Sequence, residues 1–312
     1  MSRVKIKVVG VGGGGGKIIS RIYNKNKSID YIAINTDLQD LKQCKADKLL
    51  QIGKQTTKGM GAGMQILLGE KSALENIQDV LSATLPSQVI ILVSCFGGGT
   101  GSGATPLIAK KIKERDKNVL LLSIITLPFS FEGSFKRSIA LRSLERLKDF
   151  SDAIFVLEND NITKNLEKQV TIKESFAFCD DFISKIVNSI LELITSRGVI
   201  NIDFIDIKNS LQNGGQVYFA QGVGEGENRI EMAISDAFLK NITSVDLFNK
   251  IKKFNSVLFS VAGDNFTLQE ISQISDLIKN KFGNPSKIYF GAFQDKDLRN
   301  KLKITIFACS GK

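Results

Sequence analysis

The stretch Cys95-Phe96-Gly97-Gly98-Gly99-Thr100-Gly101-Ser102-Gly103 places five glycines in seven positions, directly after the apolar run Val89–Ser94. A run with helical character, Ala104–Arg115, follows it. Because glycine has no Cβ, such a loop can bend tightly and lay several backbone N–H groups against an anion. The helix that follows adds the positive end of its dipole. The stretch therefore predicts a phosphate cradle between a strand and a helix.

A second glycine-rich loop, Gly10-Val11-Gly12-Gly13-Gly14-Gly15-Gly16, follows the strand-like run Val4–Val9. Its Gly-x-Gly-x-x-Gly pattern, with Asp37 further along, is also typical of NAD(P)-dependent dehydrogenases. The loop falls short of a P-loop, because Val11 stands where glycine is needed and Ile18 where the magnesium-binding Ser or Thr is needed. Neither class requires the stretch quoted above, so the two loops together indicate a polyphosphate held from two sides.

Short apolar runs alternate with helical patterns through residues 1–160. The run Val89–Val93 is apolar at every position, which indicates a strand buried on both faces, as in a parallel sheet covered by helices. Ligands of such sheets bind at the carboxyl ends of the strands, where both glycine loops fall. The predicted strands are Val4–Val9, Tyr31–Asn35, Val89–Ser94, Val119–Ile125 and Ala153–Leu157.

A long amphipathic helix is predicted over Lys173–Ser196, where apolar residues recur at three- and four-residue spacing. After a polar loop, Arg197–Ile207, the chain returns to an α/β pattern with a helix over Leu268–Lys281. We expect a nucleotide-binding domain over residues 1–172, a central helix over 173–197 that packs between two domains, and a smaller α/β domain over 198–312. The strands predicted for the smaller domain are Val217–Ala220, Val257–Val261, Ile288–Phe293 and Ile304–Ala308.

The composition excludes several kinds of site. The 312 residues include no histidine, which excludes Ser-His and Cys-His catalysis and histidine-based metal sites. No apolar run reaches 18 residues, so we expect no membrane span. A strand follows Met1 almost at once, so no leader peptide is expected. The cysteines are far apart and lack CxxC spacing, which predicts reduced thiols rather than disulfides or a zinc site; they are Cys44, Cys95, Cys179 and Cys309.

The formal net charge of +10 is unevenly distributed. Residues 1–172 hold 25 Lys and Arg against 16 Asp and Glu, a net charge of +9, whereas residues 173–312 hold 17 against 16, a net charge of +1. A basic half fits a nucleotide, a nucleic acid or an acidic membrane surface, and a lysine-rich proteome is the simpler explanation. Because the lysines are scattered and not interleaved with aromatic residues, we expect no DNA binding.

Three further segments join the glycine loops. Asn35-Thr36-Asp37 ends the second predicted strand, where polar groups can face a ligand. A third glycine-rich loop, Gly53–Gly63, brings two lysines and can equally be an ordinary surface loop. In Pro128–Gly133, the carboxylate of Glu132 can accept hydrogen bonds from ribose hydroxyls or cap the helix that follows.

Asn201, Asp203 and Asp206 lie within six residues, just after the predicted long helix. One interpretation is an N-cap, Asp203 or Asp206, for a helix that begins near Ile207. The other is a pair of carboxylates that orient a water molecule for attack on a phosphoryl group. A 24-residue helix spans roughly 36 Å, so we expect these carboxylates to meet the nucleotide of a neighbouring subunit. Subunits stacked head to tail in this way form a filament.

Together these motifs resemble those of the FtsZ family, the tubulin-like GTPases of bacterial cell division. The resemblance covers nearly all of the 312 residues, in the family's order and at similar spacing. It implies an α/β fold of the tubulin/FtsZ type: a parallel-sheet, Rossmann-like GTPase domain, a long central helix and a smaller α/β C-terminal domain. The segments that carry it are Gly10–Gly16, Asn35–Asp37, Thr57–Gly63, Gly97–Gly103, Pro128–Gly133, Asn159–Asp160 and Asn201–Lys208.

The resemblance also implies roles for single residues. Glu132 would contact the ribose, Phe176 and Asp180 would lie near the guanine, and Mg²⁺ would bridge phosphate oxygens without a complete set of protein ligands. The acidic loop would complete the active site of the next subunit. The residues implied to bind GTP or GDP are Gly13, Gly14, Gly15, Gly16, Lys17, Gly98, Gly99, Thr100, Gly101, Glu132, Lys136 and Asp180, and those implied to catalyse hydrolysis are Asn201, Asp203 and Asp206.

The chain departs from the family pattern at a few positions. Lys17 stands where the family usually has Asn, Cys95 replaces a common Gly, and Asp180 replaces a frequent Asn. None of these changes removes a catalytic group, so activity is expected. Family members usually continue into a linker and a tail that binds membrane tethers, whereas this sequence ends at Lys312.

The resemblance implies a cytoplasmic homopolymer at the division site, with other division proteins and membrane tethers as partners. The basic charge adds a hypothesis of direct attraction to anionic lipid. Two other functions stay open from the sequence. One is an NAD(P)-dependent oxidoreductase, which Gly10, Gly12, Gly15 and Asp37 favour. The other is a non-hydrolysing filament protein of the same fold, against which the intact acidic loop counts.

Overall fold

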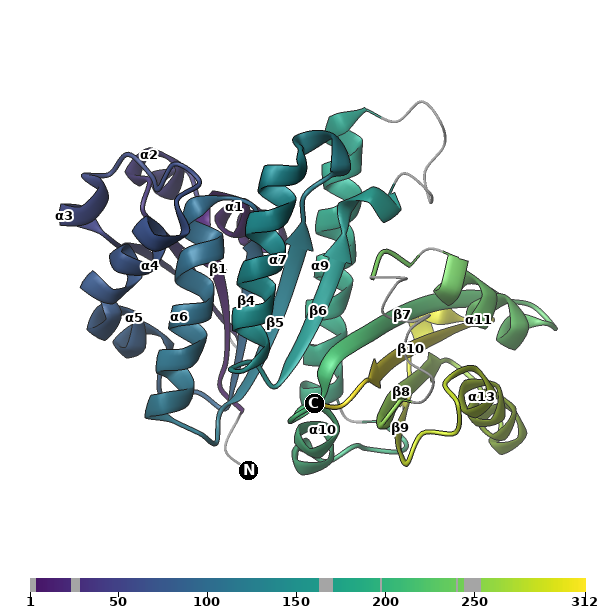
Figure 1. Cartoon of the computed structure of the whole chain (residues 1–312). Helices are drawn as coiled ribbons and strands as arrows, with labels where there is room; N and C mark the ends of the chain where they lie inside the picture. Colours follow the sequence, from purple (N-terminus) through teal and green to yellow (C-terminus); the bar gives the residue numbers. More distant parts are fainter. Residues whose placement is uncertain (1–3, 24–28, 163–170, 197, 240, 244–253) are drawn as a thin grey trace. The chain divides into compact units, whose positions relative to one another are not determined.

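The computed structural model describes residues 4–23, 29–162, 171–196, 198–239, 241–243 and 254–312 (Figure 1). The chain divides into two compact units. The first consists of the residues up to Asp160 together with Ile172–Asp181, and the second is formed mainly by Phe182–Lys312. In the described ranges, no helix is long and apolar enough to cross a membrane. All four cysteines are free thiols.

The first unit is built on a parallel sheet with the strand order β3-β2-β1-β4-β5-β6. The five strands predicted for this part of the chain are confirmed. The edge strand β3 was not predicted, because its partly exposed Lys-Leu-Leu-Gln sequence has no periodic apolar pattern. The strands are β1 (Ile6–Val11), β2 (Ile29–Asn35), β3 (Lys48–Gln51), β4 (Val89–Cys95), β5 (Leu120–Leu127) and β6 (Ala153–Glu158).

Helices cover both faces of this sheet. Side chains from α4, α5, α6 and α7 form one apolar core with β1, β2, β4, β5 and β6, and α6 and α7 lie in front of the strands in Figure 1, whereas α1 lies behind them. The helical elements are α1 (Gly12–Ile22), α2 (Leu38–Lys42), α3 (Lys54–Thr57), α4 (Ile66–Glu75), α5 (Ile77–Thr84), α6 (Gly99–Arg115), η1 (Ser130–Glu132), α7 (Ser134–Lys148) and η2 (Asn159–Asn161).

The register places the carboxyl ends of the strands along one edge. Val11 of β1 is level with Ile34 of β2 and Ser94 of β4. In the same way, β5 ends level with the end of β4 on one side and of β6 on the other. The chain therefore leaves β1, β2, β4, β5 and β6 at the same edge of the sheet, which is where parallel α/β sheets bind their ligands.

The prediction that α6 begins at Ala104 was wrong by five residues, because the helix starts at Gly99. Glycine is a poor helix former, but here it permits close packing. A Cβ placed on Gly69 of α4 would lie 2.2 Å from the carbonyl oxygen of Gly99, and one placed on Gly103 would lie 2.2 Å from that of Ile66. Backbone contact with α4 therefore accompanies helix formation in the glycine-rich segment.

The second unit carries a mixed sheet with the order β7-β10-β8-β9, in which β10 is antiparallel to both its neighbours and β8 is parallel to β9. Helices α11 and α13 pack on one face of it. Its four predicted strands and the helix over Leu268–Lys281 are confirmed. The elements are α10 (Phe204–Leu211), β7 (Gly215–Glu225), α11 (Arg229–Leu239), β8 (Ser256–Gly263), α13 (Leu268–Lys281), β9 (Lys287–Gln294), η3 (Lys296–Leu298) and β10 (Lys301–Cys309).

The long helix α9 spans Ile172–Thr195, within one residue of its prediction at each end. Its residues up to Asp181 belong to the first unit and those from Phe182 to the second. In the second unit, the ring of Phe182 meets that of Phe219 edge to face at 5.5 Å. One continuous helix therefore contributes to both units.

Candidate nucleotide site

The two predicted phosphate loops meet at the carboxyl edge of the first sheet. Gly12 opens α1 with φ +78°, and a Cβ placed on it would lie 2.9 Å from the backbone nitrogen of Gly101 and 3.6 Å from Cβ of Thr100. Gly99 opens α6. The first N–H groups of a helix have no partner within the helix. The structure thus brings the N-terminal turns of α1 and α6 together, with their free N–H groups near one another.

The glycines of α1 are closely packed. A Cβ on Gly14 would lie 2.5 Å from the Cys95 sulfur, and one on Gly16 would lie 2.8 Å from the Cys44 sulfur. A Cβ on Gly13 would lie 2.9 Å from Oδ2 of Asp40. Glycine is therefore needed in this turn for packing as well as for the approach of a ligand. Burial raises the pKa of the Cys95 thiol, which keeps it protonated near neutral pH.

The turn before α6 is held by one buried hydroxyl. Gly97 has φ +113°, a value that favours glycine, and its N–H donates to Oγ of Ser102 at 2.9 Å. Gly98 occupies the N-cap position of α6 and is exposed, and a Cβ placed on it would meet no atom within 4 Å. The structure therefore leaves open space beside the turn at Gly98.

The third glycine-rich loop lies against the second turn. Asp37, at the start of α2, forms an isolated β-bridge with Met60, and the N–H of Leu38 donates to the carbonyl of Gly59 at 3.2 Å. A Cβ placed on Gly99 would lie 2.8 Å from the carbonyl oxygen of Ala62. The loop Gly53–Gly63, which the sequence alone could equally assign to an ordinary surface loop, is thus part of the carboxyl edge of the first sheet.

A hydrogen bond that the sequence did not reveal joins Thr36 and Thr100. Their hydroxyl oxygens lie 2.7 Å apart, and both residues are buried. The signal in the sequence was the polar triplet after the second strand, but its spacing to Thr100 carries no information about contact. The side chain implied to touch phosphate therefore already has a neighbour at the end of β2.

The Glu132 carboxylate already has two partners. Its Oε1 accepts from the backbone N–H of Phe129 at 2.9 Å, and its Oε2 pairs with Nζ of Lys136 at 3.0 Å. The carboxylate closes the short helix η1 that contains it, rather than capping the helix that follows. Each carboxylate oxygen can accept more than one hydrogen bond, so contact with ribose hydroxyls stays a prediction.

Asp180 of α9 is buried and forms an ion pair with Arg21 of α1, a partner that the sequence analysis missed. The sequence offers only one weak indication of Arg21 as a site residue, which is that it lies one helical turn after Lys17. Phe176, one turn before Asp180, is 42% exposed, and its ring meets that of Phe129 edge to face at 5.9 Å. The two side chains implied to lie near the guanine are therefore on neighbouring turns of one helix.

Lys17, which adds positive charge to the family pattern, has an exposed side chain. Its Nζ lies 3.7 Å from Oδ1 of Asp40, and its side chain is 60% exposed. Pairs this exposed contribute little to stability. The Lys17 charge is therefore screened by water and stays accessible at the glycine-rich end of α1.

The acidic loop belongs to the second unit. The N–H of Gly198 donates to Oδ1 of Asn201 at 2.7 Å. Asp203 stands at the N-cap of α10 but its side chain makes no capping hydrogen bond, and its carbonyl accepts from Asp206 and Ile207. The prediction that this helix begins near Ile207 was wrong by three residues, because these backbone bonds start the helix at Phe204. In this loop the structure leaves the Asp203 carboxylate exposed.

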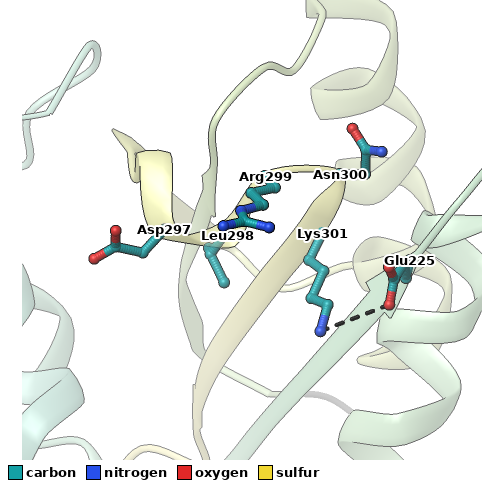
Figure 2. Close-up of a pocket in the computed structure, with 6 residues that line it drawn as sticks. All are labelled: Glu225, Asp297, Leu298, Arg299, Asn300 and Lys301. Atoms are coloured by element: carbon teal, nitrogen blue, oxygen red, sulfur yellow. Dashed lines mark ion pairs between the residues drawn. The ribbon is translucent and has the colours of Figure 1, made fainter.

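A separate hollow of about 460 Å³ lies in the second unit (Figure 2). Figure 2 shows the ion pair between Lys301 and Glu225, whose Nζ and Oε2 atoms are 3.6 Å apart. The lining mixes two acidic and two basic side chains and includes no glycine-rich turn. It therefore lacks the features of a phosphate site. Its lining residues are Glu225, Asp297, Leu298, Arg299, Asn300 and Lys301.

Comparison with known proteins agrees with this geometry. Residues 5–167 match the GTPase domain of the Tubulin/FtsZ family, and residues 215–311 match the C-terminal domain of the FtsZ family. The cell division protein FtsZ of Aquifex aeolicus (strain VF5) is 33% identical over 305 residues, which cover 97% of this chain and 82% of the relative.

Solved structures give the same result. An empty FtsZ dimer of M. jannaschii matches with a TM-score of 0.87 at 32% identity, covering 99% of this chain and 88% of that one. CetZ2 from Haloferax volcanii, solved as a GTPgS-bound protofilament, matches with a TM-score of 0.79 at 21% identity over 99% and 94% of the two chains. The second match shows the fold alone.

The predicted fold class and the predicted resemblance are confirmed. The GTPase match leaves the oxidoreductase interpretation of the first glycine loop without support, because a dehydrogenase would share neither domain. The protein is a GTPase, and the chain belongs to the FtsZ family.

Proposed function

We propose that this chain binds GTP with Mg²⁺, assembles head to tail into protofilaments and hydrolyses GTP at the junction between two subunits. In the cell, such polymers would scaffold the division ring. The observation that carries the proposal is the meeting of two glycine-rich helix N-termini at the carboxyl edge of a parallel sheet. That arrangement offers unpaired N–H groups and two helix dipoles to one polyanion.

Each part of the nucleotide has a proposed partner. Backbone N–H groups of Gly13–Gly16 and Gly98–Gly101 would hold the phosphates, and the exposed Lys17 would add positive charge. Glu132 would accept hydrogen bonds from the ribose hydroxyls while Lys136 balances its charge. Asp180 would accept from the guanine, because a carboxylate offers only acceptors and that edge of guanine offers donors.

The residues present fit Mg²⁺ held mainly by phosphate. Mg²⁺ usually keeps several waters and binds through one or two carboxylates plus substrate phosphates. Within the described ranges, no three Cys, Asp or Glu side chains gather as a metal site. When bound, the ion would neutralise phosphate charge, and it would be held mainly by phosphate oxygens and water.

Hydrolysis would need the acidic loop of a second subunit. Asp203 and Asp206 lie at the start of α10, in the second unit, whereas the glycine turns lie in the first. We propose that Asp206 accepts a proton of the attacking water and that Asn201 and Asp203 orient it. Support comes from the solved FtsZ dimer and the CetZ2 protofilament, which are assemblies of those proteins.

The proposed setting is the cytoplasm at the division site, with other division proteins and membrane tethers as partners and no DNA contact. The net charge of +10 also suggests direct attraction to anionic lipid. Co-sedimentation with anionic vesicles tests that attraction, and its absence at low salt would reject it.

Turnover per molecule tests the central proposal. We expect the GTPase rate per subunit to rise steeply with protein concentration, because the active site forms only between subunits. Sedimentation with GTP, with GDP and without nucleotide, alongside phosphate release, should show pellets that depend on GTP. A rate per subunit that stayed constant down to separated monomers would refute hydrolysis between subunits. Polymers without phosphate release would favour the non-hydrolysing filament protein.

A further inference from the structure

The hydrogen bond between Thr36 and Thr100 links the carboxyl end of β2 to the first turn of α6. Thr36 directly follows β2 and is fully buried, and Thr100 lies in the first turn of α6 and is 8% exposed. Their hydroxyl oxygens are 2.7 Å apart, and either can be the donor. A buried hydroxyl without a partner is costly, so this pair is expected to persist with and without nucleotide.

Thr100 also lies where the two glycine turns meet. The Cβ that Gly12 lacks would lie 3.6 Å from Cβ of Thr100. The hydroxyl of Thr100 is therefore close to the N-terminal turn of α1 as well as to that of α6. A phosphate held by both turns would come within reach of it.

The direction of the hydrogen bond matters, because each hydroxyl has a single proton. When Thr100 donates to Thr36, its proton is not available to an anion. When Thr36 donates to Thr100, the proton of Thr100 is free for a phosphate oxygen, which can only accept. An anion therefore favours the second direction, and each bond of such a chain polarises the next.

We propose that Thr36 is a positioning residue for the nucleotide. Its hydroxyl donates to Oγ1 of Thr100, which fixes the Thr100 rotamer and directs the Thr100 proton to a phosphate oxygen. This role rests on the proposed GTP binding. Thr36 itself stays behind Thr100 and touches no phosphate.

A double-mutant cycle on the dissociation constants for GTP and GDP tests the role, with monomeric protein and Mg²⁺ present. Thr36→Val, which keeps the side-chain shape, should weaken binding about threefold to tenfold, the range for one neutral hydrogen bond. Thr36→Ser, which keeps the hydroxyl, should bind within about twofold of the unsubstituted chain. In a Thr100→Val background, Thr36→Val should have little further effect, because it acts through Thr100.

Thr105→Val is the matched control. Thr105 lies in the same helix as Thr100 and is fully buried, and its Oγ1 has no hydrogen-bond partner in the described part of the chain. This variant should leave nucleotide affinity unchanged. Thermal unfolding of the nucleotide-free variants gives the temperatures at which each protein is fully folded. At such a temperature, Thr36→Val should still bind GTP less tightly than the unsubstituted chain.

Four results would overturn the proposal or its basis. Unchanged affinity of Thr36→Val, or effects of Thr36→Val and Thr100→Val that add fully, would refute the role of Thr36 alone. Failure of Thr36→Ser to restore binding would also refute it, because a hydroxyl at this position would then be insufficient. No binding of GTP by the unsubstituted chain would instead refute the proposed function.

Discussion

Arg21 of α1 forms an ion pair with Asp180 of α9, and the two partners differ in exposure. The Arg21 side chain is 55% exposed, whereas that of Asp180 is 9% exposed. A buried carboxylate needs an opposite charge, and Arg21 supplies it. The helix that carries the first glycine turn is therefore joined to the helix that carries the proposed guanine contact.

Asp180→Ala should weaken GTP binding about tenfold or more, because hydrogen bonds to a charged group are among the stronger ones. It should also narrow the preference for GTP over ITP, since inosine lacks the 2-amino group that the carboxylate would accept from. Titration calorimetry with both nucleotides measures this. Arg21→Gln is the control, because it removes the partner but keeps Asp180, so the preference should remain. An unchanged GTP to ITP ratio in Asp180→Ala would contradict the guanine contact.

Asp206→Ala should abolish GTP hydrolysis and keep GTP binding, because the carboxylate is proposed to act on the nucleotide of another subunit. Phosphate release and nucleotide affinity are measured on the same preparation. Asn209→Ala changes an exposed residue of the same helix α10 and serves as the control for effects on that helix. Loss of GTP binding by folded Asp206→Ala would show that the loop serves its own subunit's nucleotide.

Gly69→Ala should destabilise the first unit, because its Cβ would lie 2.2 Å from the carbonyl oxygen of Gly99. Such overpacking typically costs about 1–3 kcal/mol. Relief of this clash should displace the start of α6, which carries the second glycine turn, and should therefore also weaken GTP binding. Urea unfolding gives the free energy, with Gly98→Ala as the steric control, since a Cβ there would meet nothing within 4 Å. Equal free energies of unfolding for Gly69→Ala and Gly98→Ala would contradict the prediction, because they would mean that α4 moves away from α6 at little cost.

The second unit should lose stability in acid through Glu270. Hydrogen bonds from Arg229 hold the pKa of this carboxyl below its ordinary value of 4.5. A depressed pKa stabilises the fold above the unfolded pKa, and that contribution is lost as the pH falls through the lower, folded value. The free energy of unfolding should therefore be measured at several pH values. The difference in this free energy between the unsubstituted chain and Glu270→Gln should shrink below about pH 4.5. A constant difference down to pH 2 would contradict this linkage.

The sequence predicted what depends on local pattern. Continuous apolar runs located the central strands, and three- and four-residue spacing located α9 within one residue at each end. Edge strand β3 and the start of α6 were missed, because in both cases tertiary contact decides. The glycines from Gly99 to Gly103 become helical where they pack against the backbone of α4, and no local preference reports that packing.

Site residues divide in the same way. The glycine turns could be predicted because consecutive residues in the sequence provide their phosphate-binding features. The partners of Asp180 and Thr100 could not be predicted, because Arg21 and Thr36 are distant from them in the sequence. Each pair is brought together only by the tertiary fold. The domain boundaries near residues 172 and 197 stay a prediction, as do the roles of the acidic loop.

The position of β1 inside the sheet has a consequence for how the protein matures. β1 is synthesised before both of its neighbours, β2 and β4. It therefore waits for a partner synthesised some eighty residues later, since β1 ends at Val11 and β4 begins at Val89. Pairings this distant form slowly. Capture of GTP by a nascent chain should therefore begin only after β4 and the glycine turn that follows it have been synthesised and β4 has paired with β1.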